Sequence, residues 1–348
     1  MRKITYREAL LESMRQCLRE DENVCLFGLG VPDPKGIFGT TLGLREEFGV
    51  ERVFDMPTAE NGMTGVAIGA SLVGLKPVMT HQRVEFALLS IEQIVNQAAK
   101  WHYMTGGKMK VPIVIRMIIG RGWGQGPQHS QTLDVFFAHI PGLKVVAPST
   151  PADAKDLLTA SVRDQNPVIF MEHRWLHETV GFVNEENNAA KIGQANTVRY
   201  GSDITLISYS YALLEVLEAA RLLEKVGINC EVIDLRTLRP MDYETINHSV
   251  QKMGRVLVVN NGWVEFGITS EIIAHVTVNK FQFLKTAPKR LGTTGVPIPS
   301  SRVLANLVYP NVEKIINGVR EILPFNGLND LTKYRSEDIP NSAFKGPF

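Results

Sequence analysis

The chain has 348 residues, of which 44% are hydrophobic and 21% charged, a size that suggests about two domains with buried cores. Its 37 basic and 36 acidic residues leave a formal charge of +1, so we expect binding neither to nucleic acid nor to a membrane surface. Three scattered cysteines are too few for a disulfide framework or a cysteine-rich metal site, and they predict a reducing compartment, the cytoplasm. No apolar run approaches the ~20 residues of a membrane-spanning helix. We therefore expect a soluble α/β protein.

Helical and extended patterns alternate through the first half of the chain. Thr5 and Glu8 have the spacing of a capping box and predict a helix that runs to about Glu20. A short apolar run over 24–27 stops at Gly28 and predicts a buried strand. Further strands are predicted at 52–55, 77–80, 111–117, 144–147 and 168–171, and helices at 62–73, 86–103 and 152–163. This alternation is typical of a mostly parallel sheet that helices cover on both faces.

A second series of the same kind follows a polar, aperiodic stretch around 184–188. Its strands are predicted at 204–208, 229–234 and 255–260, and its helices near 212–226, 243–253 and 270–278. We therefore expect two doubly wound α/β domains, over 1–180 and 202–325, joined by a linker at 181–201. Residues 326–348 are polar and contain proline, which predicts an extended arm.

Glu60 lies where a predicted strand turns through Pro57 into a helix. Ligands of open α/β sheets bind beyond the carboxyl ends of the strands, so this position makes Glu60 a candidate functional residue. An acidic residue at a helix N-terminus also complements the helix dipole, and that simpler role is an open alternative.

A glycine-rich segment at 120–126 leads into His129. Its spacing is not that of a dinucleotide fingerprint or a phosphate loop, but such glycines favour a tight turn or a close approach of a ligand to the backbone. A histidine beyond a strand end can act as an acid or a base. An exposed loop histidine is an equally good interpretation, and no acidic partner for His129 can be assigned from the sequence.

His173 and His177 are four residues apart, the spacing of two metal ligands on a helix. They follow a predicted strand, in a segment without a clear helical pattern, so we expect no metal site there. The sequence also lacks a nucleophile elbow, a Walker loop and a zinc signature.

Several motifs, in order, resemble the beta subunit of the thiamine-diphosphate-dependent decarboxylase of 2-oxo acid dehydrogenase complexes, of the pyruvate or branched-chain type. The segments that carry the resemblance are 4–10, 55–74, 94–107, 128–131, 141–148 and 164–167. The resemblance covers nearly all of the first domain and, more loosely, the second. It implies a transketolase-like pyrimidine-binding domain followed by a transketolase C-terminal domain.

The resemblance also implies roles for particular residues. Glu60 would hydrogen-bond N1′ of the cofactor aminopyrimidine, and His129 would assist the 2-oxo acid or the acceptor step. Three residues would line the aminopyrimidine pocket: Thr58, Gln82 and Phe86. A structural potassium site built largely from backbone carbonyls would involve Ile113, Ser161, Val162, Asp164 and Asn166.

The family's motif for the cofactor diphosphate and magnesium, Gly-Asp-Gly followed later by Asn-Asn, is missing. The chain has no Gly-Asp-Gly, and Asn187-Asn188 and Asn260-Asn261 stand outside that context. One copy of this chain would therefore supply only the pyrimidine half of a thiamine diphosphate site. We expect an alpha subunit to hold the diphosphate and Mg²⁺, in an α2β2 heterotetramer that is active only when both subunits are present.

Some positions depart from the family's pattern. Gly28-Leu29-Gly30-Val31 stands where relatives usually have Gly-Glu-Asp-Val, and Thr80 stands where many have Glu. Gln82 and Phe86 are similar to the branched-chain type. These changes suit an unusual acyl substrate or an acceptor other than a lipoyl group. If the acceptor is the family's usual lipoyl group, we expect a lipoyl-bearing acyltransferase as a further partner. The sequence does not name the 2-oxo acid.

Two other functions are alternatives. The first is the C-terminal part of a split transketolase-like ketol transferase, whose phosphosugar would require basic residues; Arg83, Arg116 and Arg121 are candidates, but the sequence shows no cluster. The second is a non-catalytic partner subunit, against which Glu60 and His129 both argue.

Overall fold

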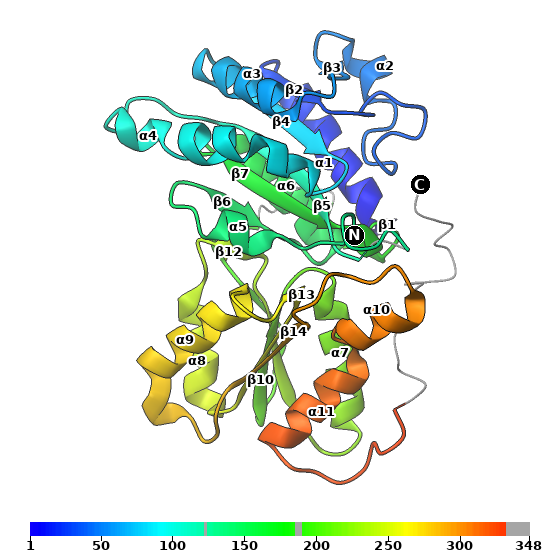
Figure 1. Ribbon diagram of the computed structural model, residues 1–348, viewed down its shortest axis with the longest axis vertical. Helices are drawn as coiled ribbons and strands as arrows, with labels where there is room; N and C mark the ends of the chain where they lie inside the picture. The colour runs from blue at the N-terminus through cyan, green and yellow to red at the C-terminus, as the bar shows by residue number, and fades with distance from the viewer. Residues whose placement is uncertain (122–123, 185–189, 332–348) are drawn as a thin grey trace.

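The computed structural model describes residues 1–121, 124–184 and 190–331. Figure 1 shows two halves stacked along the long axis, each a sheet flanked by helices. The described chain forms a seven-stranded sheet in the first half and a five-stranded sheet in the second. The predicted α/β class with two doubly wound units is thus confirmed. The residues around 185–189 and most of the predicted arm, 332–348, lie outside the described residues.

The larger sheet has the order β12-β6-β7-β5-β4-β2-β3 and is parallel except for β12. Its central strands are buried along their length, as expected where helices cover both faces. The strands are β2 (Val24–Phe27), β3 (Val53–Phe54), β4 (Lys76–His81), β5 (Val114–Ile119), β6 (Lys144–Val146), β7 (Val168–His173) and β12 (Thr237–Arg239).

Three helices of the first half, α1, α3 and α6, match their predicted positions, whereas α2 and α5 were not predicted. The predicted capping box is present: Glu8 N–H donates to Thr5 Oγ1, and Thr5 N–H donates to the Glu8 carboxylate. The helices are α1 (Tyr6–Glu20), α2 (Leu44–Phe48), α3 (Glu60–Leu72), α4 (Trp101–Met104), α5 (Asp134–Ala138) and α6 (Pro151–Arg163), with a 3₁₀ turn η3 (Arg174–Leu176).

The prediction of one helix over 86–103 is wrong. The segment is a 3₁₀ turn η1 (Phe86–Ser90), a π turn η2 (Gln93–Ala98) and then α4. Hydrophobic periodicity does not distinguish these hydrogen-bond patterns. The segment follows the surface of α3, where Thr64 Oγ1 donates to Ser90 Oγ over 3.0 Å, and this packing sets its local winding.

The second sheet has the order β14-β13-β10-β11-β9, in which only β9 is antiparallel. Its strands are β9 (Asn196–Arg199), β10 (Ile204–Ser208), β11 (Cys230–Asp234), β13 (Val256–Trp263) and β14 (Lys289–Thr293). Its helices are α7 (Ala212–Glu224), α8 (Tyr243–Met253), α9 (Ile268–Lys280), α10 (Arg302–Val308) and α11 (Val312–Ile322), with a 3₁₀ turn η4 (Phe281–Phe283).

Two short strand pairs that the sequence did not predict connect distant parts of the chain. β1 (Arg2–Thr5) pairs antiparallel with β8 (Val180–Val183). β12, which lies in the second half of the sequence, pairs antiparallel with β6 and forms the outer strand of the first sheet. The second half therefore contributes hydrogen bonds to the sheet of the first.

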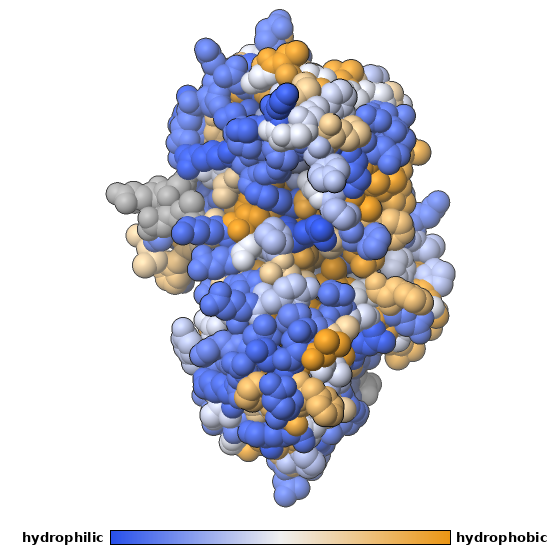
Figure 2. Space-filling view, turned by 90° about the vertical axis from the view of Figure 1, so that its left-hand side faces the viewer, coloured by the Kyte–Doolittle hydropathy of each residue, from blue (hydrophilic) through white to orange (hydrophobic). Residues whose placement is uncertain are grey.

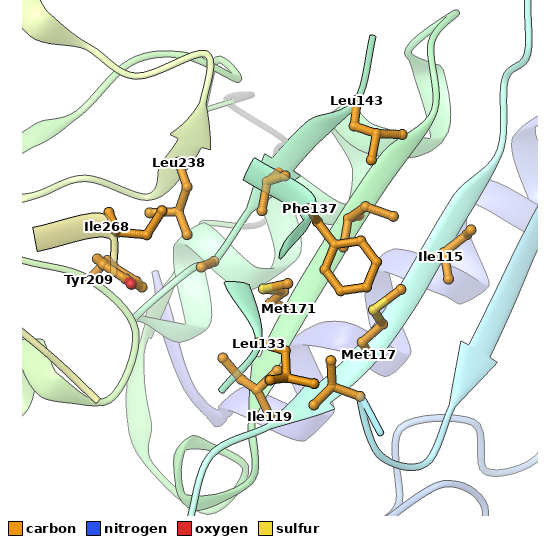
Figure 3. Close-up of a cluster of buried hydrophobic side chains, with 14 of the residues drawn as sticks. Ile115, Met117, Ile119, Leu133, Phe137, Leu143, Met171, Tyr209, Leu238 and Ile268 are labelled. Carbon is orange, nitrogen blue, oxygen red and sulfur yellow. The ribbon is translucent and has the colours of Figure 1, made fainter. Parts of the chain in front are cut away.

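A single apolar cluster continues from one half into the other. It contains Ile119, Leu133 and Met171 of the first half together with Tyr209 and Ile268 of the second, and Figure 3 shows these side chains across the junction.

On the face shown in Figure 2, hydrophobic side chains gather in the middle and upper part among hydrophilic ones. Among the described residues, no helix combines the length and apolar character needed to cross a membrane.

A fully buried ion pair joins the two central strands of the first sheet. Arg116 on β5 donates to Glu172 on β7 from Nε (2.6 Å) and Nη2 (3.0 Å), and also to Thr40 Oγ1 (3.0 Å). Burial opposes ionisation of Glu172, but the Arg116 charge and its hydrogen bonds keep the pKa of Glu172 below its ordinary value. Burial also lowers the pKa of the adjacent His177 to about 4.

Replacing Glu172 with Gln should destabilise the fold strongly, because it leaves the Arg116 charge buried without compensation. We expect a loss of about 3–5 kcal/mol in the free energy of unfolding, measured by chemical denaturation at neutral pH. The difference in unfolding free energy between wild type and variant should shrink as the pH falls below the ordinary glutamate pKa of 4.5. The wild type then loses the stability that the ionised Glu172 contributes.

The exposed pair between Arg163 and Glu20 provides the matched control. Glu20→Gln should change the free energy of unfolding by less than about 1 kcal/mol. Equal effects of the two substitutions would show that the buried pair contributes no more than a surface pair.

Candidate functional site

Four loops meet beyond the carboxyl ends of β2, β3, β4 and β5. Because these strands are parallel, their carboxyl ends lie at one edge of the sheet. The loops carry Leu29, Glu60, Gln82 and His129 in that order along the chain. The edge therefore brings together residues that the sequence places up to 100 positions apart.

Glu60 is the first residue of α3 and is 4% exposed. The preceding residue, Ala59, makes no side-chain cap, so the carboxyl of Glu60 lies at a helix end with free N–H groups. Among the described residues, no side chain donates a hydrogen bond or forms an ion pair with this carboxyl. Thr58 lies on the exposed turn before the helix.

The turn after β4 is held against the loop after β2. Gln82 Nε2 donates to Leu29 O over 3.0 Å, and Gly30 N–H donates to Asp55 Oδ1 over 3.2 Å. Gly28 allows this close approach, since a Cβ atom there would lie 2.3 Å from Thr80 O. Leu29 and Gly30, which stand where the family usually has acidic residues, thus leave the Gln82 amide bonded to backbone.

His129 lies beside Phe86, with ring centroids 5.5 Å apart and planes tilted by 46°. Both side chains are half-buried. The backbone of the histidine loop is fixed by Glu85, whose Oε1 accepts a hydrogen bond from Gln131 N–H over 2.9 Å. Burial raises the pKa of Glu85. Sequence reasoning missed this contact, because it links two loops through their tertiary positions.

The second half covers the histidine loop from the other side. Tyr309 OH donates to Ser130 O over 3.1 Å. Tyr209 OH donates to the carboxylate of Asp134 and accepts from Asn260 Nδ2 over 2.8 Å. Burial raises the pKa of Asp134 to about 6. Asn260, which the sequence could assign to no motif, therefore belongs to a buried polar contact between the two halves.

Two of the three candidate arginines lie at this edge. Arg83 Nη1 donates to Gly120 O over 3.4 Å, and Arg121 is the next residue after Gly120. The structure thus brings together two arginines for which the sequence showed no cluster. The third, Arg116, is paired with Glu172 inside the sheet and does not reach this edge.

The two histidines after β7 do not form a metal-binding helix. His173 ends β7, the next three residues are a 3₁₀ turn, and the ring of His173 stacks on Tyr211 at 4.9 Å. His177 lies beside Glu172. In the part of the chain that the structure describes, no three His, Cys, Asp or Glu side chains are placed to hold a metal ion.

The residues of the predicted potassium site lie together at the opposite edge of the sheet. Ile113 O accepts from Val168 N–H (2.9 Å), and Ser161 O accepts from Asp164 N–H (3.2 Å). Burial opposes ionisation of Asp164, but hydrogen bonds from Lys144 and Asn166 lower its pKa below the ordinary value. Val162 lies in the last turn of α6, and Asn166 lies in the turn between α6 and β7.

The first edge fits the aminopyrimidine of thiamine diphosphate. Glu60 offers a buried carboxyl without a protein partner, and Phe86 offers an aromatic surface. Some of the buried polar atoms without a partner among the described residues lie at the end of β4 and on the loops after β4 and β5: Thr80 Oγ1, His81 Nε2, Glu85 Oε2, His129 Nδ1, Ser130 Oγ and Thr132 Oγ1. Such atoms are uncommon in a complete fold, and a ligand at this edge would give them partners.

Comparison with known families gives the same division of the chain into two parts. The family "Transketolase, pyrimidine binding domain" matches residues 2–178, and "Transketolase, C-terminal domain" matches residues 193–315. A solved structure titled "Split gene transketolase, inactive beta4 tetramer" has a TM-score of 0.75 at 20% identity, covering 93% of this chain and all of the other. At that identity the likeness shows the fold alone.

Curated relatives are more similar to this chain in sequence than that solved structure is. "Pyruvate dehydrogenase E1 component subunit beta" of Rhizobium meliloti (strain 1021) is 40% identical over 92% of this chain and 70% of its own. The protein of that name from Rickettsia bellii (strain RML369-C) is 38% identical over 92% and 98%. The mitochondrial protein of Bos taurus is 38% identical over 92% and 90%. This chain belongs to the transketolase-like family of pyruvate dehydrogenase E1 component beta subunits.

Proposed function

We propose that this chain is the beta subunit of a thiamine-diphosphate-dependent 2-oxo acid dehydrogenase and forms one side of an active site shared with an alpha subunit. The family depends on thiamine diphosphate. The observation that carries the proposal is the buried, unpartnered carboxyl of Glu60 beside the Phe86–His129 contact. Because the relatives come from bacteria and from mitochondria, the cytoplasmic location stays an expectation.

Thiamine diphosphate, when bound, supplies the carbanion chemistry that decarboxylation of a 2-oxo acid requires. Glu60 would share a hydrogen bond with N1′ of the aminopyrimidine, since its largely buried side chain has no partner among the described residues. Phe86 would present its ring to the aminopyrimidine, with Gln82 and Thr58 at the pocket's margin. His129 would give or take a proton at a ring nitrogen, on a loop that Glu85 holds in place.

The other half of the site would come from an alpha subunit. This chain has no Gly-Asp-Gly, so a partner would bind the diphosphate and Mg²⁺, in an α2β2 assembly. A lipoyl-bearing acyltransferase would be the acceptor in the standard reaction of the family.

A bound K⁺ would stabilise the turn between α6 and β7. Hard cations prefer oxygen ligands, and Ile113, Ser161 and Val162 can offer backbone carbonyl oxygens beside the ionised Asp164. Asn166, which donates to Asp164, can also offer its carbonyl oxygen. This site would act on stability and not on the reaction.

Arg116 is paired with Glu172 and would not reach a phosphosugar. Arg83 and Arg121, however, lie at the site, so the arginines do not separate the ketol-transferase alternative from decarboxylation. Analysis of products separates the two reactions, because decarboxylation releases carbon dioxide and ketol transfer does not. A purely structural partner would have no need of the buried Glu60 carboxyl.

Glu60→Gln should abolish turnover of 2-oxo acids by the assembled enzyme, with a fall of at least ~100-fold in kcat, because the amide cannot share a proton with N1′. Steady-state kinetics with carbon dioxide detection measure it. Glu46→Gln is the matched control, since Glu46 is an exposed acid in the first turn of α2. An unchanged rate in Glu60→Gln would favour the non-catalytic role.

Thiamine diphosphate with Mg²⁺ should bind only when the alpha subunit is present. Isothermal titration into this chain alone should give no binding heat, and titration into the mixture should give saturable binding. Tight binding to the chain alone would contradict the shared site, and no binding in either case would contradict the cofactor assignment.

Exchange of K⁺ for tetramethylammonium at equal ionic strength should lower the unfolding temperature by a few degrees, because a cation that binds only the folded chain stabilises it. Differential scanning calorimetry measures the shift. Asp164→Asn should reduce it; equal unfolding temperatures in the two salts would rule out the potassium site.

A further inference from the structure

Arg83 is a buried cation that forms no ion pair among the described residues. The residue is 5% exposed, and its guanidinium donates to Gly120 O and to Gln125 Oε1, both of which are neutral. No carboxylate oxygen of the described residues lies within 4.0 Å of it. Burial lowers the pKa of Arg83 to about 10, which is still high enough for a full positive charge at neutral pH.

Two other arginines of low exposure form ion pairs within this chain. Arg116 is fully buried and makes a bidentate pair with Glu172, and Arg236 pairs with Asp153 over 2.7 Å. Buried charges are normally paired in this way, because desolvation of an isolated charge is costly. The lack of such a partner at Arg83 indicates that its anion comes from outside the chain.

Arg83 lies close to the residues proposed to act in the reaction. It stands in the turn after β4, between Gln82 and Phe86. Val84 N–H donates to Ile118 O (2.9 Å) and holds this turn against β5. Gln125, the neutral partner of Arg83, precedes His129 by four residues on the loop after β5. The guanidinium thus faces the loop that carries the histidine.

The charge around Arg83 also favours an anion. Arg121 follows Gly120 and stacks on Trp175 at 4.0 Å and on Tyr309 at 4.6 Å. Burial and the charges of Arg121 and Arg83 hold the pKa of His173 well below its ordinary value, so that ring stays neutral. The carboxylate of Glu85 opposes, from beyond ion-pair distance, the lowering of the Arg83 pKa by burial, and it accepts from Gln131 N–H over 2.9 Å.

We propose that Arg83 binds a second anionic group on the acyl chain of the 2-oxo acid, so that the preferred substrates are 2-oxo acids with a terminal carboxylate or phosphonate. The anion replaces the Gln125 amide as the acceptor of the guanidinium hydrogen bonds, which become charge-assisted and bidentate. This inference rests on the proposed decarboxylation and names its substrate class.

Substrates of matched chain length test the proposal in the assembled enzyme with thiamine diphosphate and Mg²⁺. 2-Oxoglutarate and 4-phosphono-2-oxobutyrate carry a terminal anion, and 2-oxopentanoate has an apolar chain of the same length as 2-oxoglutarate. We expect kcat/KM to be at least tenfold higher for one of the two anionic substrates than for 2-oxopentanoate. Which of the two is preferred shows whether the site takes a carboxylate or a phosphonate. A preference for 2-oxopentanoate would overturn the proposal.

Arg83→Gln should remove this preference by raising KM for the anionic substrate at least tenfold. Arg83→Lys, which keeps the charge but not the bidentate fork, should retain part of it. Arg19→Gln, at an exposed residue of α1, is the matched control and should leave the preference intact. Thermal unfolding of each variant shows whether the fold is preserved. An unchanged preference in folded Arg83→Gln would contradict the role of Arg83.

Equilibrium binding separates this inference from the proposed function. Glutarate, 4-phosphonobutyrate and pentanoate cannot be decarboxylated as 2-oxo acids, so calorimetric titration into the assembled protein needs no turnover. Binding of a dianion at least tenfold tighter to wild type than to Arg83→Gln supports the anion site even if no 2-oxo acid is consumed, in which case only the proposed reaction fails. Equal binding to the two proteins rejects the anion site.

Discussion

The buried ion pair between Arg116 and Glu172 is the interaction on which the position of the site depends. It joins β5 and β7 within the sheet and binds Thr40 in the loop that follows β2. β5 leads into the glycine-rich loop and His129, and β7 ends at His173, which stacks on the second half. Since a charge of this kind tolerates little displacement from its partner, the pair fixes both strands relative to each other and thereby both loops.

The two halves share one site because the same edge of the first sheet meets the second half. Tyr309 binds the backbone beside His129, and Tyr209 with Asn260 binds Asp134. The apolar cluster of Figure 3 lies across the same junction. Contacts from both halves hold the backbone directly after His129, at Ser130 and Gln131, and a fixed position is what an acid or base needs in order to act at a chosen atom.

The sequence predicted helices and strands correctly where the hydrophobic pattern runs without interruption along one segment. It gave the positions of α1 with its capping box and of β10, and it singled out Glu60 and His129. It missed β12, which is short and defined only by its pairing with β6. It also missed α11, although the apolar residues at 312, 315, 316, 319 and 322 have a helical period that could have been found. The contacts of Glu85 and Arg83 could not be predicted, because each joins two loops that only the folded sheet brings together.

The pairing of β12 with β6 has a consequence for the independence of the two domains. Cutting the chain between them would remove β12 and leave β6 as an uncovered edge strand, whose free N–H and C=O groups can pair with other chains. It would also expose the apolar surface of the shared cluster to water. The two family domains are therefore one cooperative unit in this molecule: neither is a self-sufficient fragment, and a cut between them would yield material prone to aggregate.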